Sequence, residues 1–439
     1  MRVHCDSQYQ YGSGAAAAVA QDSRQLSGII ADILIPGRGQ PVTNAAVVVD
    51  GASIIWTGPI AEMPPSYKRL SFIHVPVLLP GLWDVHTHYM AGDVLDNLGF
   101  SSRSYLPGSS ALIGAITVND LRATLMAGFT SVRELGGYAG NIKPALKDSL
   151  IVGPNVYSSH SVLSIIGGHG DDHLLPLDTV AASIDGLHCI CTGPTECVRK
   201  VREMVRRGAE IIKICSSGGI LSFYDQPEEQ QFSPEELKAI VEEASRLGVA
   251  VASHAIGKAG IMAALEAGVK SIEHGEYFDE ECAALMREKD AFFVPTRHIV
   301  ETLAAHADTV PPLQRAKLER MLPLSRSSLQ LAVREKVKIA LGTDTYSSDA
   351  KSDIAHGKNA KEMYWFTVAG MSPIDAIEAG TANPPETLGP KAPLSGQIKA
   401  GYDADLIAVS SNPLEDIKVL GVPEKITHVW KGGKLVKSP

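Results

Sequence analysis

The sequence predicts an α/β fold: a (β/α)8 TIM-like barrel with a small β-sandwich domain built from both chain ends. Three observations lead to this prediction. Short apolar runs alternate with amphipathic helical segments through the middle of the chain, polar residues follow several of these runs, and strand-like segments broken by Gly and Pro stand at both ends. In such a barrel the active site lies at the carboxyl ends of the strands, so we expect those polar residues to converge.

The two ends of the chain share one pattern. After a predicted flexible tail at residues 1–26, which lacks the leucine-rich core of a secretory signal, residues 27–78 contain strand-like segments such as SGIIADILIPG and NAAVVVDGASIIWTG. The pattern returns at residues 385–439 in ADLIAVSSNP and ITHVWKGGKLV. Each set alone would leave an apolar face uncovered, so one β-sandwich formed by both ends is the simplest prediction.

Residues 79–384 are predicted to form the barrel. The clearest helix is SPEELKAIVEEASRLG, where Ser233 caps the start, Pro234 fits the first turn, Glu236 completes a capping box and Gly248 ends the helix. The following run, VAVASHA, is apolar on both faces, as buried parallel strands are. A doubly wound open sheet is the alternative. It is less favoured because ligands of that fold gather at one switch point, whereas these polar residues follow many strands.

Six barrel residues have side chains suited to binding a metal or forming a carbamate, and each closes an apolar run. They are His86 and His88 in VLLPGLWDVHTH, Lys213 in AEIIKICSSGG, His254 in VAVASHA, His274 in KSIEHG and Asp344 in VKIALGTD. Strand alternation turns His86 and His88 to the same side, so both imidazoles can reach one cation. An isolated His-x-His is commonly a surface or core pair. Together, however, imidazoles and a carboxylate from successive strands predict a two-metal hydrolytic site.

The chain resembles the amidohydrolase superfamily, and within it the branch of ochratoxinase, metal-dependent prolidases and acyl-amino-acid carboxypeptidases. Besides the motifs above, the resemblance is carried by GPNVYSSHSVLSIIGGHGD, QFSPEELKAIVEEA, GYDADLIAVSSNPLEDI and THVWKGGKL, and it runs from about Gly28 to Lys437. It implies a binuclear metal-dependent amidohydrolase that cleaves a non-peptide or dipeptide-like amide bond. N-acyl aromatic amino acids, including ochratoxin-like amides, are the substrates it suggests.

The resemblance also implies how the six residues act. Two divalent ions, taken to be Zn²⁺, would divide the ligands, the more buried ion being held by His86, His88 and Asp344 and the more exposed one by His254 and His274. A protonated ammonium cannot ligate a cation, so Lys213 would bridge both ions as a carbamate formed with CO2. Asp344 would also take a proton from the attacking water and hand it to the leaving amine.

Three further residues are expected to contact substrate. His169, in IIGGHGD, matches a position where relatives carry a histidine beside the reacting carbonyl; the alternative is a loop histidine bonded to backbone. Arg297, in FFVPTRHIV, is suited to a substrate carboxylate, while an interior ion pair or a helix-end contact stays open. Relatives usually read His-x-His-Gly after the fifth strand, whereas this chain reads HAIG. Ile256 therefore replaces a substrate-contacting histidine, which makes the pocket less polar and carboxylated substrates less favoured.

Two segments are expected to form loops over the site. Residues 92–114 follow the first ligand strand, and Tyr89, Phe100 and Tyr105 are candidates for an aromatic wall, with ordinary packing as the alternative. TYSSDAKSDIAHG is a second candidate lid, in which His356 is taken as a solvated loop histidine.

Composition narrows the partners. The net charge of −9, without a block of Lys and Arg, argues against nucleic acid and anionic membranes, and no run approaches the ~20 apolar residues of a membrane helix. The six cysteines lack framework spacing, so free thiols in a cytoplasmic, reducing setting are expected. An extra zinc site at His188, Cys189, Cys191 and Cys197 is a weaker alternative. We expect a small-molecule substrate and, by analogy with relatives, a homo-oligomer.

Other chemistries use the same kind of site. Lactone or ester hydrolysis and decarboxylation in a specialised metabolic pathway stay open, because a fold does not select among them. Lys213 argues against most mononuclear deaminases, which need no bridging carbamate. A non-catalytic scaffold is disfavoured by the complete ligand set.

Overall fold

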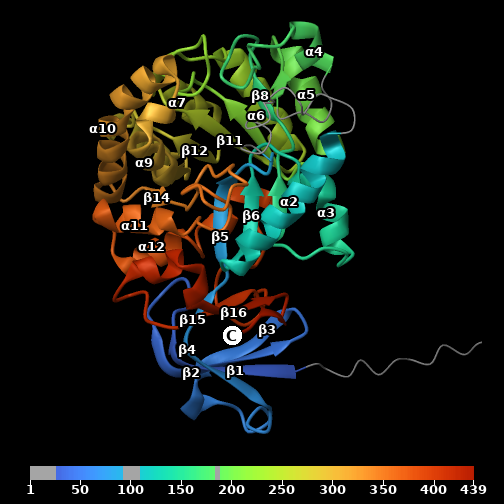
Figure 1. Cartoon of the computed structure of the whole chain (residues 1–439), viewed down its shortest axis with the longest axis vertical. Coiled ribbons are helices and arrows are strands. Elements are labelled where there is room, and N and C mark those ends of the chain that lie inside the picture. The colour runs from blue at the N-terminus through green and yellow to red at the C-terminus, as the bar shows by residue number, and fades with distance from the viewer. Residues whose placement is uncertain (1–25, 92–108, 183–187) are drawn as a thin grey trace, which may run out of the picture.

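The computed structural model describes residues 26–91, 109–182 and 188–439. It has two parts: a larger one in which helices surround parallel strands, and a smaller one formed by strands from both ends of the sequence (Figure 1). Phe100 and Tyr105 lie outside the described residues, as does the predicted tail except for Leu26. The candidate aromatic wall therefore stays a prediction.

The smaller part is one curled sheet. Its strands, in the order β17-β16-β15-β4-β1-β2-β3, are Lys434–Lys437, Ile426–Lys431, Leu406–Val409, Phe72–Pro80, Leu26–Leu34, Val42–Asp50 and Ser53–Pro59. Only β1 and β4 pair in parallel. The edge strand β3 contacts the segment that precedes β15, where Ile54 N donates to Tyr402 O at 2.9 Å. The sheet thus encloses its own core, including Leu34, Val47 and Leu406.

The larger part is the predicted (β/α)8 barrel. Its strands are β5 (Leu82–Thr87), β6 (Phe129–Glu134), β7 (Asn155–Ser158), β8 (Val162–Ser164), β10 (Ile211–Cys215), β11 (Ala250–Ala255), β12 (Ser271–His274), β13 (Phe292–Val294) and β14 (Lys338–Ile339), with β9 (His188–Ile190) added beside β8. All pair in parallel. We count β7 and β8 as one interrupted third strand, which gives eight. Val85 N donates to Leu341 O and Asp344 N to His86 O, which joins the last strand to the first.

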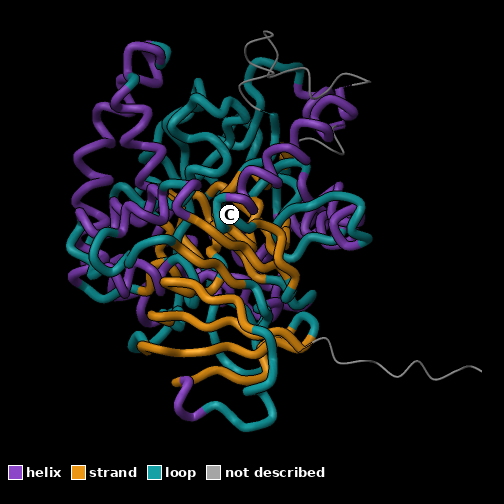
Figure 2. The backbone as a smooth tube through the Cα atoms, turned by 60° about the horizontal axis from the view of Figure 1, so that its bottom comes forward, coloured by secondary structure: helices purple, strands orange, loops and turns teal. Residues whose placement is uncertain are grey.

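Helices lie outside the barrel strands (Figure 2). They are α2 (Ser109–Met126), α3 (Ala139–Lys147), α4 (Leu177–Ala182), α5 (Pro194–Arg207), α6 (Pro234–Arg246), α7 (Lys258–Ala267), α8 (Glu280–Glu288), α9 (Arg297–Ala305), α10 (Pro312–Arg334), α11 (Lys361–Val368) and α12 (Pro373–Ala379). Short 3-10 helices occupy η1 (Ile60–Glu62), η3 (Ala307–Thr309), η4 (Pro384–Lys391), η5 (Ile417–Gly421) and η6 (Pro423–Lys425). No helix in the described part of the chain is long and apolar enough to cross a membrane.

Helix α6 follows the local rules read from its sequence. Ser233 Oγ accepts from Glu236 N at 3.3 Å, and Glu236 Oε2 accepts from Ser233 N at 2.9 Å, which completes the capping box. Gly248, just beyond the helix, has φ +70°. A left-handed residue at this point suits glycine and stops the helix. Leu237, Ile240 and Ala244 are fully buried on the inner face.

We expect Ser233→Ala to lower the free energy of unfolding by about 1 kcal/mol, since one amide at the start of α6 loses its acceptor. Denaturant unfolding of the two proteins measures the difference. The matched control is Ser245→Ala, because Ser245 is exposed in the same helix and caps nothing. Equal losses in both variants would contradict the assigned cap.

Candidate metal centre

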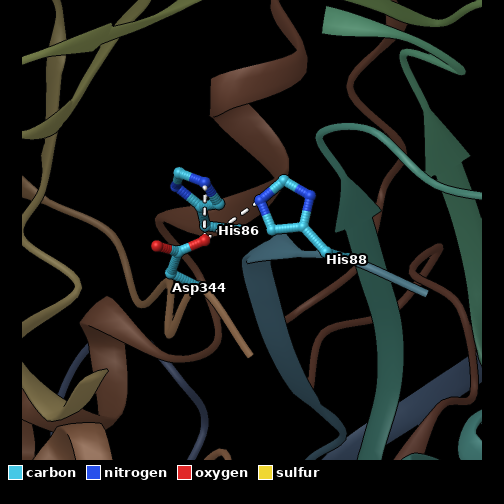
Figure 3. Close-up of side chains that lie close together, drawn as sticks. All are labelled: His86, His88 and Asp344. Atoms are coloured by element: carbon cyan, nitrogen blue, oxygen red, sulfur yellow. Dashed lines mark ion pairs between the residues drawn. The ribbon is translucent and has the colours of Figure 1, made fainter. Parts of the chain in front are cut away.

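Three of the predicted ligands meet at the carboxyl end of the barrel. Asp344 Oδ1 lies 3.0 Å from His88 Nε2 and 3.4 Å from His86 Nε2 (Figure 3). One donor atom from each of the three lies within 4.8 Å of the other two. This spacing lets all three reach one small cation.

The other three predicted ligands join the same cluster. Lys213 Nζ lies 3.4 Å from His86 Nε2, and the ring of His274 lies 5.0 Å from that of His86 and 4.5 Å from that of His254. The expectation that Lys213 ends its strand is wrong, because it is the third of five residues in β10. Its long side chain nevertheless carries the amine up to the histidines. The structure thus brings all six residues together.

Each imidazole uses one ring nitrogen in a hydrogen bond with the surrounding protein. The partners are Glu273 Oε2 for His86 Nδ1 (2.9 Å), Gly136 O for His88 Nδ1 (2.8 Å), Gly218 O for His254 Nε2 (3.0 Å) and Thr296 Oγ1 for His274 Nδ1 (2.8 Å). The carboxylate and the two carbonyls can only accept, so they fix the proton of His86, His88 and His254 on the bonded nitrogen and leave the lone pair of the other free for a metal. The Thr296 hydroxyl can donate or accept. The donor set therefore fits divalent cations.

A buried ion pair supports His86. Glu273 Oε1 accepts from Arg133 Nη2 at 2.7 Å, and both side chains are fully buried. Arg133 Nε also donates to Val85 O at 2.6 Å. Sequence reasoning missed both residues, although a Glu and an Arg inside the apolar runs SIEH and FTSVRE were a usable sign. A buried charge needs a partner, so these two were candidates for each other.

Three residues where strands β12, β13 and β14 give way to loops have left-handed backbones. The φ angles are +75° for His274, +45° for Thr296 and +59° for Asp344. Such conformations cost on the order of 1–3 kcal/mol each in residues other than glycine, and they cluster at functional sites. Two of these residues are predicted ligands and the third bonds a predicted ligand, so three of the nine left-handed residues other than glycine in the described chain lie at the centre.

Burial sets the charge states within the cluster. It lowers the pKa of His86, His254 and His274 well below the usual value, which keeps these imidazoles neutral. Burial likewise lowers the pKa of Lys213. For Asp344 burial acts to raise the pKa, but the neighbouring His86 and His88 outweigh it and the net shift is downward. A neutral imidazole and an ionised carboxylate are the forms that bind metals.

His169 joins the cluster beside His254. The two rings stack at 4.2 Å, and His169 Nδ1 lies 2.9 Å from Ser222 Oγ, so its side chain bonds to a side chain and not to backbone. Ser222 Oγ itself donates to Gly219 O, so it accepts from His169 Nδ1–H. The hydrogen-bond pattern assigns the Nδ1–H tautomer and leaves Nε2 free.

Arg297 lies in an interior ion pair. Its Nη2 donates to Glu301 Oε1, and its guanidinium lies 5.8 Å above the Trp365 ring. The other terminal nitrogen, Nη1, is buried without a hydrogen-bond partner. Contact with a substrate carboxylate stays a prediction for Arg297. Ile256 is buried in an apolar cluster with Ile220, Ile299 and Ile354 among others.

His356 is not the solvated loop residue that its sequence suggested. Its side chain is 1% exposed, and its ring stacks on Tyr89 at 4.3 Å. Its Nε2 lies 4.0 Å from Asp120 Oδ2. Among the described residues, His188, Cys189, Cys191 and Cys197 do not gather as a group of three or more donors around one point, although Cys191 Sγ lies 3.2 Å from Cys197 Sγ.

Comparison with known proteins decides the family. The profile of the Amidohydrolase family matches residues 77–436. The chain belongs to the amidohydrolase family. This amidohydrolase is 44% identical to ochratoxinase of Aspergillus niger over 433 residues, which is 95% of this chain and 88% of that protein. Membership makes it a hydrolase that acts on carbon–nitrogen bonds.

Solved structures of related proteins share the fold of this chain. The amidohydrolase superposes on the crystal structure of A. niger ochratoxinase with a TM-score of 0.87 and 43% identity, covering 95% of this chain and 96% of the other. A Xaa-Pro dipeptidase with bound methionine in its active site gives 0.82 at 30% identity, covering 94% and 100%. By sequence alone, imidazolonepropionase of Pseudomonas fluorescens is a more distant relative, with 24% identity over 90% of this chain and 92% of its own length.

We expect Glu273→Gln to weaken metal binding about 10- to 100-fold while the protein stays folded, because His86 loses its anionic partner. Competition with a coloured zinc chelator measures the affinity. Glu243→Gln is the matched control, since Glu243 is also buried and paired with two arginines, but on helix α6. An unchanged affinity in Glu273→Gln would show that the pair does not tune His86.

We expect His356→Phe to stabilise the protein selectively at acidic pH. Burial lowers the pKa of His356 to about 3, whereas the unfolded value is ~6.5. Below pH 6.5 the unfolded wild type takes up a proton that the folded form refuses, so wild-type stability falls with pH through this window. The variant avoids this loss and gains about 2 kcal/mol on wild type between pH 7 and pH 5. Denaturant unfolding at pH 7 and pH 5 measures the difference. The same difference in unfolding free energy between variant and wild type at both pH values would refute this prediction.

Proposed function

We propose that the protein is a binuclear metal-dependent amidohydrolase that cleaves a non-peptide or dipeptide-like amide bond, with N-acyl aromatic amino acids as poorer substrates because Ile256 disfavours their carboxylate. One observation carries the proposal: four histidines at the barrel mouth each bond the surrounding protein through one ring nitrogen, and the other ring nitrogens of His86 and His88 face Asp344, with Lys213 beside His86. Similarity to ochratoxinase and to a Xaa-Pro dipeptidase supports amide substrates.

Two sets of residues would hold the cations, which we take to be Zn²⁺. His86, His88 and Asp344 form the first set and His254 and His274 the second. When bound, such cations supply Lewis acidity, which lowers the pKa of water and polarises a carbonyl group. The protein's own part is to keep the donor atoms neutral or anionic and to fix their directions.

Lys213 would join the two sets as a carbamate. In this step the neutral amine attacks CO2, forms a C–N bond and releases one proton, which leaves an anionic group with two oxygens. Burial and the nearby Arg133 lower the pKa of the amine, which favours the neutral form that this reaction needs. The reaction turns a side chain that cannot ligate a cation into one that can.

Asp344 and His169 would act on the substrate. The carboxylate of Asp344 is ionised, so it can accept the proton of the attacking water and deliver it to the leaving amine. His169 keeps Nε2 free for the substrate amide, because Ser222 occupies its other nitrogen. The apolar surroundings of Ile256 favour a hydrocarbon part of the substrate on that side.

The test is turnover of N-acyl amino acids, dipeptides, esters and lactones by protein reconstituted with zinc and bicarbonate. We expect amide hydrolysis, abolished by chelation and by Lys213→Ala or Asp344→Asn. With ¹³C-labelled CO2, a carbamate carbon resonance is expected in wild type and absent in Lys213→Ala. The proposal is wrong if Lys213→Ala keeps full turnover with intact metal content. It is also wrong if the protein hydrolyses only esters and lactones.

We expect Ile256→His to raise the preference for carboxylated over neutral amides about 10-fold, since a hydrogen-bond donor replaces hydrocarbon. The ratio of kcat/KM for an N-acyl amino acid and its amide-capped analogue measures this preference. Ile256→Leu keeps the hydrocarbon and the volume, and we expect it to leave the ratio unchanged.

A further inference from the structure

We propose that Lys317, on helix α10, is a positioning residue that fixes the loop after β10 and thereby the imidazoles of His169 and His254. The loop, called the β10 loop below, comprises residues 216–231. The inference rests on the proposed function only where it concerns turnover; the link to His254 concerns metal binding itself.

Lys317 is a buried lysine whose three N–H groups all have partners. Its Nζ donates to Gly219 O at 3.1 Å, Ser222 O at 2.9 Å and Asp225 O at 2.6 Å. The side chain is 2% exposed. An ammonium has three donors and no acceptor, so one charge holds three points of the β10 loop at once.

Asp225 completes this anchor. Its Oδ2 accepts from Gly219 N at 2.9 Å, and its Oδ1 lies 3.8 Å from Lys317 Nζ without a hydrogen bond of its own. The same Oδ2 lies 3.9 Å from His169 Nδ1. The buried ammonium is thus balanced by a carboxylate of the loop it holds, which makes the pair a cross-link between α10 and the loop.

The first link to the metal centre runs through Gly218. Its carbonyl accepts from His254 Nε2 at 3.0 Å, which leaves Nδ1 of His254 for the metal. Gly219, held by Lys317 and Asp225 together, is the next residue. A change in the peptide between the two glycines would turn the Gly218 carbonyl away and free the His254 ring to rotate.

The second link runs to His169. Ser222, whose carbonyl Lys317 holds, accepts from His169 Nδ1 through its hydroxyl. Gly219 lies directly against the ring, since a Cβ at Gly219 would come within 2.1 Å of His169 Nδ1 and Cε1. One side chain on α10 therefore holds both the hydrogen-bond partner and the packing surface of His169.

The test compares Lys317→Met with Arg334→Met, which removes an equal charge from an exposed position of the same helix whose partners, Glu280 and Glu335, lie outside the β10 loop. In metal-free protein we expect Lys317→Met to lose amide hydrogen-exchange protection at Gly218 and Gly219 while the barrel strands keep theirs. With zinc bound, we expect release to a chelator to accelerate about 10- to 100-fold. Wild-type exchange and zinc release in Lys317→Met would overturn the proposal.

A double-mutant cycle separates positioning from general destabilisation. We expect Lys317→Met to lower kcat on the order of 100-fold with little change in KM, and to add little further loss in a His169→Asn background. Full additivity of the two losses would overturn the link to His169.

Ser222→Ala is the second variant if Lys317→Met does not fold. It removes the acceptor of His169 Nδ1 and the hydroxyl's bond to Gly219 O, but it keeps the three bonds from Lys317 to the loop, so we expect a lower kcat with unchanged zinc release. Wild-type kcat in Ser222→Ala would overturn the link to His169. If wild-type protein hydrolyses no amide, the proposed function fails, whereas hydrogen exchange and zinc release still decide the role of Lys317.

Discussion

An imidazole has two nitrogens, and the partner given to one decides what the other can do. At the mouth of this barrel all four histidines that we propose as ligands have such a partner, supplied by a carboxylate, two backbone carbonyls and a hydroxyl. The partners come from residues around the cluster and not from the ligands themselves. The directions of the free lone pairs therefore depend on the whole barrel. The left-handed backbone of His274 helps to set the direction of its ring, and that of Asp344 helps to set the direction of its carboxylate.

That the predicted ligands gather at one rim could be foreseen from the sequence, because the signal of each one is local. A histidine or aspartate that closes an apolar run at the end of a parallel strand must lie at the same rim as its counterparts, whatever the rest of the barrel does. Helix α6 was predictable for the same reason, since its capping box lies within four consecutive residues. Each of these predictions needed only the periodicity of one segment.

The surroundings of the ligands were not predictable in this way. Glu273 meets His86 and Arg133 across distant segments, and the three carbonyls around Lys317 converge only once a helix and a loop have packed together. His356 reads as a loop residue, yet tertiary packing buries it against Tyr89. The small β domain from both chain ends was predictable, but its form as one curled seven-stranded sheet was not, because strand patterning reports which face is buried and not how far a sheet curls.

The pairing of β4 with β15 has a consequence for the chain during its synthesis. β4 leads into the barrel, while β15 is synthesised only after the last barrel helix, α12. Until then one edge of β4 lacks its neighbour and offers open backbone groups to any extended segment nearby. The nascent protein therefore keeps an unpaired strand edge through most of its translation, and only the late pairing of β15 with β4 covers that edge.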